Sequence, residues 1–173
     1  MNTFVAVLQL FVAAAFVSIP VVRHRYGADA MAGARAELAR QGVRTTVLHE
    51  NGMRFDASGH ETAAPVTVAA VMVTLAALNL FDGPWAVPLT RVLMVLVLLG
   101  NGVILYSQLT AVRSVRSAFA RRNDPELARV DVPALLKAAE DGFPRWTWTL
   151  QNVRHTVVFG AALLSLGAPA LLG

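Results

Sequence analysis

Apolar positions gather in four long runs that are separated by two longer polar stretches. The runs cover residues 4–22, 66–81, 88–112 and 150–172. Each is close to the roughly 20 consecutive apolar residues that a helix needs to cross a bilayer. Only the Gly- and Pro-containing link "DGPWAVP" separates the second run from the third, so these two runs must pair antiparallel. The pattern predicts an all-α integral membrane protein with four transmembrane helices in a single membrane domain, residues 1–173.

The two polar stretches, residues 23–64 and 113–149, lack the Ser, Gly and Pro enrichment of flexible linkers. In the first, Met31, Ala34 and Leu38 recur at helical spacing, which predicts a helix over about 28–41 that ends at Gly42. In the second, Asp131 and Gly142 are typical of the start and the stop of a short helix. We therefore expect a cytoplasmic helix in the first stretch and a cytoplasmic helical elbow in the second.

The segment "VLHENGMRF", residues 47–55, predicts a different element. Asn-Gly between two short apolar runs is the strongest local signal of a β-hairpin. Such a hairpin would place Leu48, Met53 and Phe55 on one face. Because a lone two-stranded ribbon is marginally stable in water, these three side chains need a cover. The preceding helix can supply part of it, and the rest must come from the other polar stretch, the bilayer surface or another protein. We favour docking on a partner protein.

Composition and charge agree with the membrane interpretation and orient the chain. Hydrophobic residues make up 55% of the sequence and charged residues only 15%, against about 25% in ordinary soluble domains. The formal net charge is +4. Basic residues concentrate in the two polar stretches, and the positive-inside rule then places both stretches in the cytoplasm and both termini outside the cytoplasmic membrane. The basic residues are explained by this flanking role, so we expect no nucleic-acid partner.

A few polar residues lie within the apolar runs or in the short link between them. These are Gln9, Asn79, Asp82, Arg91 and Asn101. Polar groups are costly in lipid, so they either line a substrate or proton path or bond neighbouring helices. No acidic residue occurs inside any run, which favours bonding between helices. Asp82 is the nearest acidic partner for Arg91, and we expect Asp82, Asn79 or a partner chain to hold the Arg91 guanidinium.

Few residues are available as cofactor or metal ligands. The sequence has no Cys, which excludes disulfides, Cys-ligated zinc and iron–sulfur clusters. His24 and His155 stand at the ends of the first and fourth runs and could together ligate a haem b. Both adjoin Arg residues, which favours simple interfacial positions, so we expect neither a cofactor nor a metal. Anionic lipid headgroups are the expected partners of four Arg residues: Arg113, Arg116, Arg121 and Arg122.

Sequence motifs of catalysis are absent: we find no phosphate-binding loop, nucleophile elbow or metalloprotease motif. We therefore expect no catalytic activity of the chain's own. The favoured function is an accessory or scaffolding subunit that docks through its cytoplasmic loops on other subunits of a larger membrane protein complex. Two alternatives stay open: a small transporter or channel subunit, and a haem-bearing membrane anchor of a redox complex.

Overall fold

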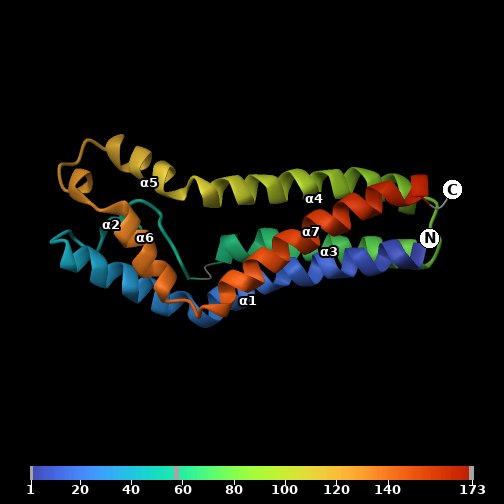
Figure 1. The fold of residues 1–173 in the computed structure, drawn as a ribbon, viewed down its shortest axis with the longest axis horizontal. Helices are drawn as coiled ribbons and strands as arrows, with labels where there is room; N and C mark the ends of the chain where they lie inside the picture. The colour runs from blue at the N-terminus through green and yellow to red at the C-terminus, as the bar shows by residue number, and fades with distance from the viewer. Residues whose placement is uncertain (1, 57–58, 172–173) are drawn as a thin grey trace. The chain divides into compact units, whose positions relative to one another are not determined.

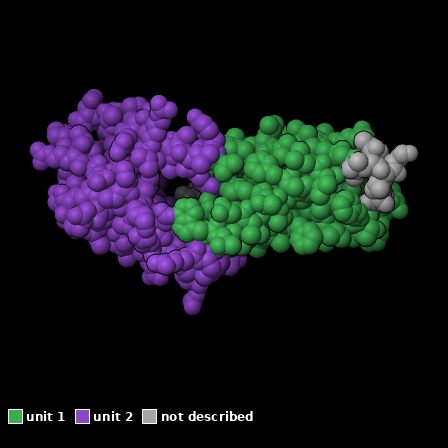
Figure 2. All heavy atoms as spheres, viewed as in Figure 1, with its two compact units in different colours: residues 1–20, 59–105, 148–173 green, residues 21–58, 106–147 purple. Residues whose placement is uncertain are grey.

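A computed structural model describes residues 2–56 and 59–171 of the chain. The chain divides into two compact units (Figure 2). Unit 1 contains residues 1–20, 59–105 and 148–173, and unit 2 contains residues 21–58 and 106–147. The described residues form helices and no strand: α1 (Asn2–Arg40), α2 (Val47–Glu50), α3 (Gly59–Leu80), α4 (Ala86–Leu109), α5 (Ala111–Ala120), the 3₁₀ helix η1 (Leu127–Arg129), α6 (Val132–Asp141) and α7 (Trp146–Leu171).

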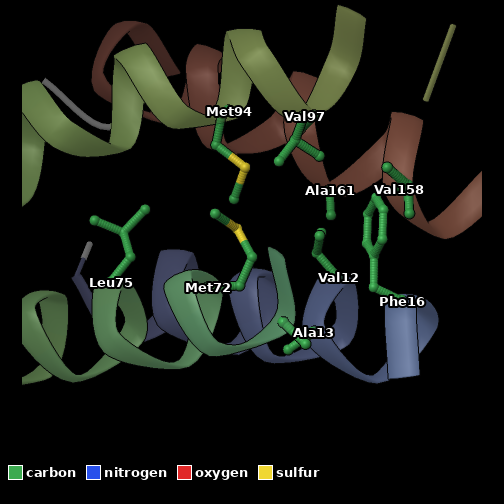
Figure 3. Packing of buried hydrophobic residues seen from close by; sticks show 11 residues of the cluster. Val12, Ala13, Phe16, Met72, Leu75, Met94, Val97, Val158 and Ala161 are labelled. Carbon is green, nitrogen blue, oxygen red and sulfur yellow. The ribbon is translucent and has the colours of Figure 1, made fainter. Parts of the chain in front are cut away.

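Unit 1 is a helical bundle. The first half of α1 lies beside α3, α4 and α7, and successive helices of the bundle run in opposite directions (Figure 1). Each helix turns small and medium-sized apolar side chains inward, and these form one core (Figure 3): Val12, Ala13, Phe16, Ala69, Met72, Leu75, Met94, Val97, Val158, Ala161 and Ala162. Polar residues of unit 1 are buried as well among those described: Gln9, Asn79, Thr90, Asn101, His155 and Ser165.

Three helices of the described chain, α1, α3 and α4, are long and apolar enough to cross a membrane. The outward face of α4 agrees with a membrane setting, because Leu96, Leu99 and Val103 are each 58–67% exposed, an arrangement that a soluble protein avoids over a large patch. The expectation of four spans is wrong for α7. Among the described residues α7 has no stretch that is long and apolar enough, because Arg154 and His155 fall within its first half.

The first helix is longer than expected. We expected an apolar span over 4–22 and a separate helix over 28–41, but α1 runs unbroken from Asn2 to Arg40. Gly27, between the two expected helices, is helical and fits closely against its neighbours. A Cβ atom at Gly27 would lie 2.5 Å from the Cα of Asp56, closer than real contacts allow, so only glycine permits the chain at 55–56 to pack here.

Unit 2 has its own apolar core. It joins the second part of α1 to α2, α5, η1 and α6 through Ala34, Leu38, Val43, Val47, Leu48, Phe119, Leu127, Val132, Leu135 and Ala139.

Two backbone contacts between α1 and α6 are unusually close. A Cβ at Gly33 would lie 2.5 Å from the backbone oxygen of Ala138, and one at Gly142 would lie 2.4 Å from the Cα of Ala30. Glycine is therefore what allows α1 and α6 to approach each other.

The predicted β-hairpin is wrong. Residues 47–50 form the short helix α2, and Gly52 ends it with a φ of +63°. The N–H of Met53 donates to the oxygen of Leu48, and the N–H of Gly52 donates to the oxygen of His49, which is the Schellman pattern of a helix C-terminus. A type I′ hairpin turn would need positive φ at both central residues, yet Asn51 has a φ of −103°.

Candidate functional site

Three polar side chains meet inside unit 1, one each from α1, α3 and α4. The Nδ2 of Asn79 donates to the Oε1 of Gln9 at 3.2 Å and to the Oγ1 of Thr90 at 3.0 Å, and the Nε2 of Gln9 donates to the same Thr90 oxygen at 3.1 Å. Asn79 also bonds the backbone oxygen of Leu75 at 2.9 Å. All three side chains are at most 5% exposed. We call Gln9, Asn79 and Thr90 the amide cluster.

A second polar contact joins α4 to α7. The Nδ1 of His155 lies 3.1 Å from the Oδ1 of Asn101, and both residues are buried. This contact fits the tautomer that carries its proton on Nδ1, because the amide oxygen can only accept. The Nδ2 of Asn101 is buried and has no hydrogen-bond partner among the described residues, so the pair has a spare donor.

Apolar side chains separate the amide cluster from the Asn101–His155 pair. The buried positions of α4 are, in order, Ala86, Thr90, Met94, Val97 and Asn101, so two apolar layers lie between its two polar ones. Met94 and Met72 face each other in these layers, and Val97 lies beside them (Figure 3). The amide cluster and the Asn101–His155 pair are therefore two separate polar sets. One further polar side chain of unit 1, Ser165, is buried, and its hydroxyl has no hydrogen-bond partner among the described residues.

Two further residues that we singled out in unit 1 lie on its surface. Asp82 and Arg91 are both exposed, and the ion pair between them stays a prediction. Asp82 has a φ of +51°, and the N–H of the next residue, Gly83, donates to the oxygen of Leu78. Asp82 therefore has a local structural role, since it ends α3 in the left-handed conformation that usually requires glycine or asparagine.

The densest set of charges lies in unit 2 around Arg44, which we call the Arg44 cluster. Its guanidinium bonds the Oε2 of Glu50 at 2.8 Å, the Oδ2 of Asp124 at 2.6 Å, and Glu126. Its backbone N–H also donates to the Oε1 of Glu126 at 2.6 Å. The segment after α1 is thus tied to the segment between α5 and η1.

The Arg44 cluster changes the acidity of its members. Hydrogen bonds from the Arg44 guanidinium lower the pKa of Glu50 and that of Asp124. The backbone N–H and then the guanidinium of Arg44 lower the pKa of Glu126. The three carboxylates in turn raise the pKa of Arg44. These shifts favour the ionised form of all four groups, and their ion pairs hold the two segments together.

The three residues expected to dock on a partner are covered within unit 2. Leu48 is 2% exposed and belongs to the core, and Met53 and Phe55 are half-buried against it. The chain at this place is fixed from α1, because the guanidinium of Arg23 donates to the backbone oxygen of Arg54 at 2.9 Å. The exposed apolar face that we expected at residues 47–55 is therefore absent from the described structure.

The remaining candidates divide by exposure. Arg113, Arg116, Arg121 and Arg122 lie on the surface of unit 2, as does His24, whereas His155 is buried in unit 1. Haem ligation by His24 and His155 stays a prediction. Among the residues that the structure describes, no three His, Asp or Glu side chains are grouped to hold a metal ion.

The sequence does not predict the role of Thr90 or the contacts of Arg44 with Asp124 and Glu126. Thr90 looks like any threonine in an apolar run, and only the fold reveals that it accepts two hydrogen bonds. Arg44 lies 80 and 82 positions from Asp124 and Glu126 in the sequence, so no local pattern could join them. A usable signal was available for Asp124 and Glu126 alone, as acidic residues on both sides of Pro125 in an otherwise basic stretch.

The sequence and the structure were compared with known proteins. No protein-family model, no curated protein and no solved structure matches it significantly.

Proposed function

We propose that the protein is an accessory or scaffolding subunit of a larger membrane protein complex. In this proposal unit 1 holds the chain in the cytoplasmic membrane and unit 2 is the body that contacts other subunits. The observation that carries the proposal is that the two long polar stretches fold together into one body with its own apolar core. Loops that only connected membrane helices would not need such a core.

The interior of unit 1 favours an anchor over a transporter or channel. Gln9, Asn79 and Thr90 form hydrogen bonds with one another. Apolar layers separate this cluster from Asn101 and His155. A path for ions or polar solutes needs polar or hydrated groups along its length. The hydrogen bonds of the amide cluster instead fix which faces of three helices meet.

The distribution of charge supports a cytoplasmic position for unit 2. Of the 15 basic residues of the chain, only Arg91 and Arg154 belong to unit 1. Segments rich in Lys and Arg that adjoin membrane helices stay on the cytoplasmic side. The short link between α3 and α4 then faces the outside.

Site-specific photo-crosslinking in intact cells, followed by mild-detergent purification, tests the proposal. In one set of variants the crosslinker is placed at Arg35 on α1 or at Lys137 on α6, which are exposed in unit 2. In a second set it is placed at Leu99 or at Val103 on α4, which are exposed in unit 1. Leu38, which is fully buried, serves as the negative control. We expect the unit 2 positions to react with one identified subunit that also co-purifies in fixed stoichiometry.

Two outcomes would overturn this function. One is a chain that purifies without any stoichiometric protein partner under conditions that preserve membrane complexes. The other is crosslinking only from Leu99 and Val103, which would make the membrane face of α4 the contact surface and leave unit 2 without the role proposed for it.

A further inference from the structure

Helix α5 carries a basic surface that nothing in the described structure neutralises. Val115 and Phe119 turn toward the core of unit 2, whereas Arg113 and Arg116 lie on the exposed side. Arg121 and Arg122 follow in the next turn and are also exposed. We call these four arginines, Arg113, Arg116, Arg121 and Arg122, the α5 basic surface. No acidic residue occurs between Asp82 and Asp124 in the sequence.

Three other basic residues of unit 2 form ion pairs within the chain. Arg40 pairs with Glu37, Lys137 pairs with Asp141, and Arg44 holds three carboxylates. The nearest acidic residue in the sequence, Asp124, is one of those three and is thus already engaged. Within the described residues, no ion pair is found for any arginine of the α5 basic surface. Its charge is available for an external anion.

The position of α5 in the chain limits where this surface can lie. α4, one of the three helices able to cross a membrane, ends at Leu109, and Arg113 follows four residues later. A chain advances at most about 3.6 Å per residue, so Arg113 lies within about 14 Å of the end of α4. The polar headgroup layer on each side of the hydrocarbon core is several ångströms thick, and arginine side chains reach into it from nearby.

We propose that the α5 basic surface binds the anionic phospholipid headgroups of the bilayer that holds unit 1. This inference rests on the membrane position proposed above for unit 1, and it does not depend on a protein partner. Several arginines beside a membrane helix are the usual recognition element for acidic lipids. Arg113 and Arg116 lie one helical turn apart on the same side of α5, so both can contact the same membrane surface.

The effect of each arginine should be measurable. One Lys or Arg near an anionic surface strengthens association by about fivefold, so loss of two should weaken it by about thirtyfold. Because the chain has no cysteine, a Ser117→Cys variant can carry a single environment-sensitive fluorophore. Ser117 is exposed on α5 next to Arg116.

The experiment uses the full-length labelled chain in nanodiscs, without any partner protein. Emission is compared in discs of phosphatidylcholine alone and in discs that also contain phosphatidylglycerol. We expect the acidic lipid to shift the emission to shorter wavelength, and added salt to reverse the shift through screening. Arg113→Gln with Arg116→Gln should abolish most of the shift, whereas Arg113→Lys with Arg116→Lys should keep most of it.

A matched control removes the same charge elsewhere. Arg35→Gln with Arg129→Gln deletes two exposed arginines of unit 2 outside α5, and this variant should behave like the parent chain. Equal emission in the two kinds of disc, or an equal loss of the shift in the control, overturns the proposal. So does a shift that inorganic phosphate removes at constant ionic strength, because the surface would then bind a soluble anion. A failed search for protein partners leaves this measurement unaffected.

Discussion

Asn79 is the side chain that links three helices of unit 1. Its amide donates to Gln9, Thr90 and the backbone of Leu75. Hydrogen bonds between membrane helices contribute about 0.6 to 2 kcal/mol each. We therefore expect Asn79→Leu to lower the free energy of unfolding by about 1–3 kcal/mol, measured by thermal unfolding in mild detergent.

A double-mutant cycle separates this contact from a general packing defect. Asn79→Leu and Gln9→Leu each remove the same Asn79–Gln9 bond. The double variant should thus lose less stability than the sum of the two single variants. Strictly additive losses would mean that the bond contributes nothing measurable.

Arg44 should make unit 2 sensitive to acid. Because the pKa values of Glu50, Asp124 and Glu126 are lowered in the folded protein, folded unit 2 binds fewer protons than the unfolded chain near pH 4. The stabilisation is fully present above the ordinary carboxyl pKa range, about 4, and is lost as pH falls through the lowered values. Arg44→Gln removes this stabilisation at neutral pH, so the variant starts from a lower free energy of unfolding and unit 2 should begin to unfold at a higher pH.

Trp146 provides a local signal for this acid titration. Its ring packs edge-to-face on Tyr26, with 5.9 Å between centroids, and both residues belong to unit 2. With the other two tryptophans replaced by Phe, the emission of Trp146 reports on unit 2 alone. Arg35→Gln, which removes an exposed arginine outside the cluster, is the control and should leave the midpoint unchanged. An identical midpoint for Arg44→Gln and the parent would refute the role of Arg44.

At the scale of secondary-structure elements, the contact of α1 with α6 depends on Gly33. An added Cβ there would meet the backbone oxygen of Ala138 at 2.5 Å, and backbone cannot rotate aside. Gly33→Ala should therefore cost about 1–3 kcal/mol, as overpacking does, although alanine favours helix by about 1 kcal/mol. Thermal unfolding gives the value. Gly100→Ala in α4 is the matched control, since a Cβ at Gly100 meets nothing within 4 Å, and it should be neutral or stabilising.

The ends of helices show what the sequence can and cannot predict. Gly42 was predicted to end a helix and does so with a φ of +69°, and Asp131 caps α6 by accepting from the N–H of Ala134 at 3.2 Å. The sequence also predicts a turn at Gly52, but the turn ends helix α2 and does not join two strands. A left-handed glycine serves a helix C-terminus as well as a hairpin, and only tertiary packing chooses between them.

The candidate sites also differ in how far the sequence predicts them, because some depend on local pattern and others on tertiary packing. Gln9, Asn79 and Asn101 stand out in apolar runs, so their burial and hydrogen bonding follow from the cost of polar groups in lipid. The contacts of Arg44 join segments far apart in the chain, and local spacing carries no information about them. The sequence likewise leaves several possible covers for Leu48 open, and only the fold shows that the second polar stretch supplies it.

For the whole molecule, the orientation in the membrane can be tested directly. Single cysteines replace His49, which is exposed in unit 2, and Pro84, which is exposed in the link between α3 and α4. The parent chain has no cysteine to interfere. From the position of the basic residues we expect a membrane-impermeant thiol reagent to label intact cells at 84, and at 49 only after the membrane is opened. The reverse pattern would invert the proposed topology.

The apolar layers of Met72, Met94 and Val97 between the two polar sets of unit 1 also bear on the energy supply of the cell. A proton gradient across a membrane is lost through any continuous chain of water and polar groups. The apolar side chains of Met72, Met94 and Val97 offer no hydrogen-bond partners that would hold such a chain of water. Liposomes that contain the protein should accordingly keep an imposed pH difference as long as protein-free liposomes do. Replacing Met94 with Asp, midway between Thr90 and Asn101, should shorten that time. With unit 1 in a membrane as proposed, many copies of the chain would then leave such a gradient intact.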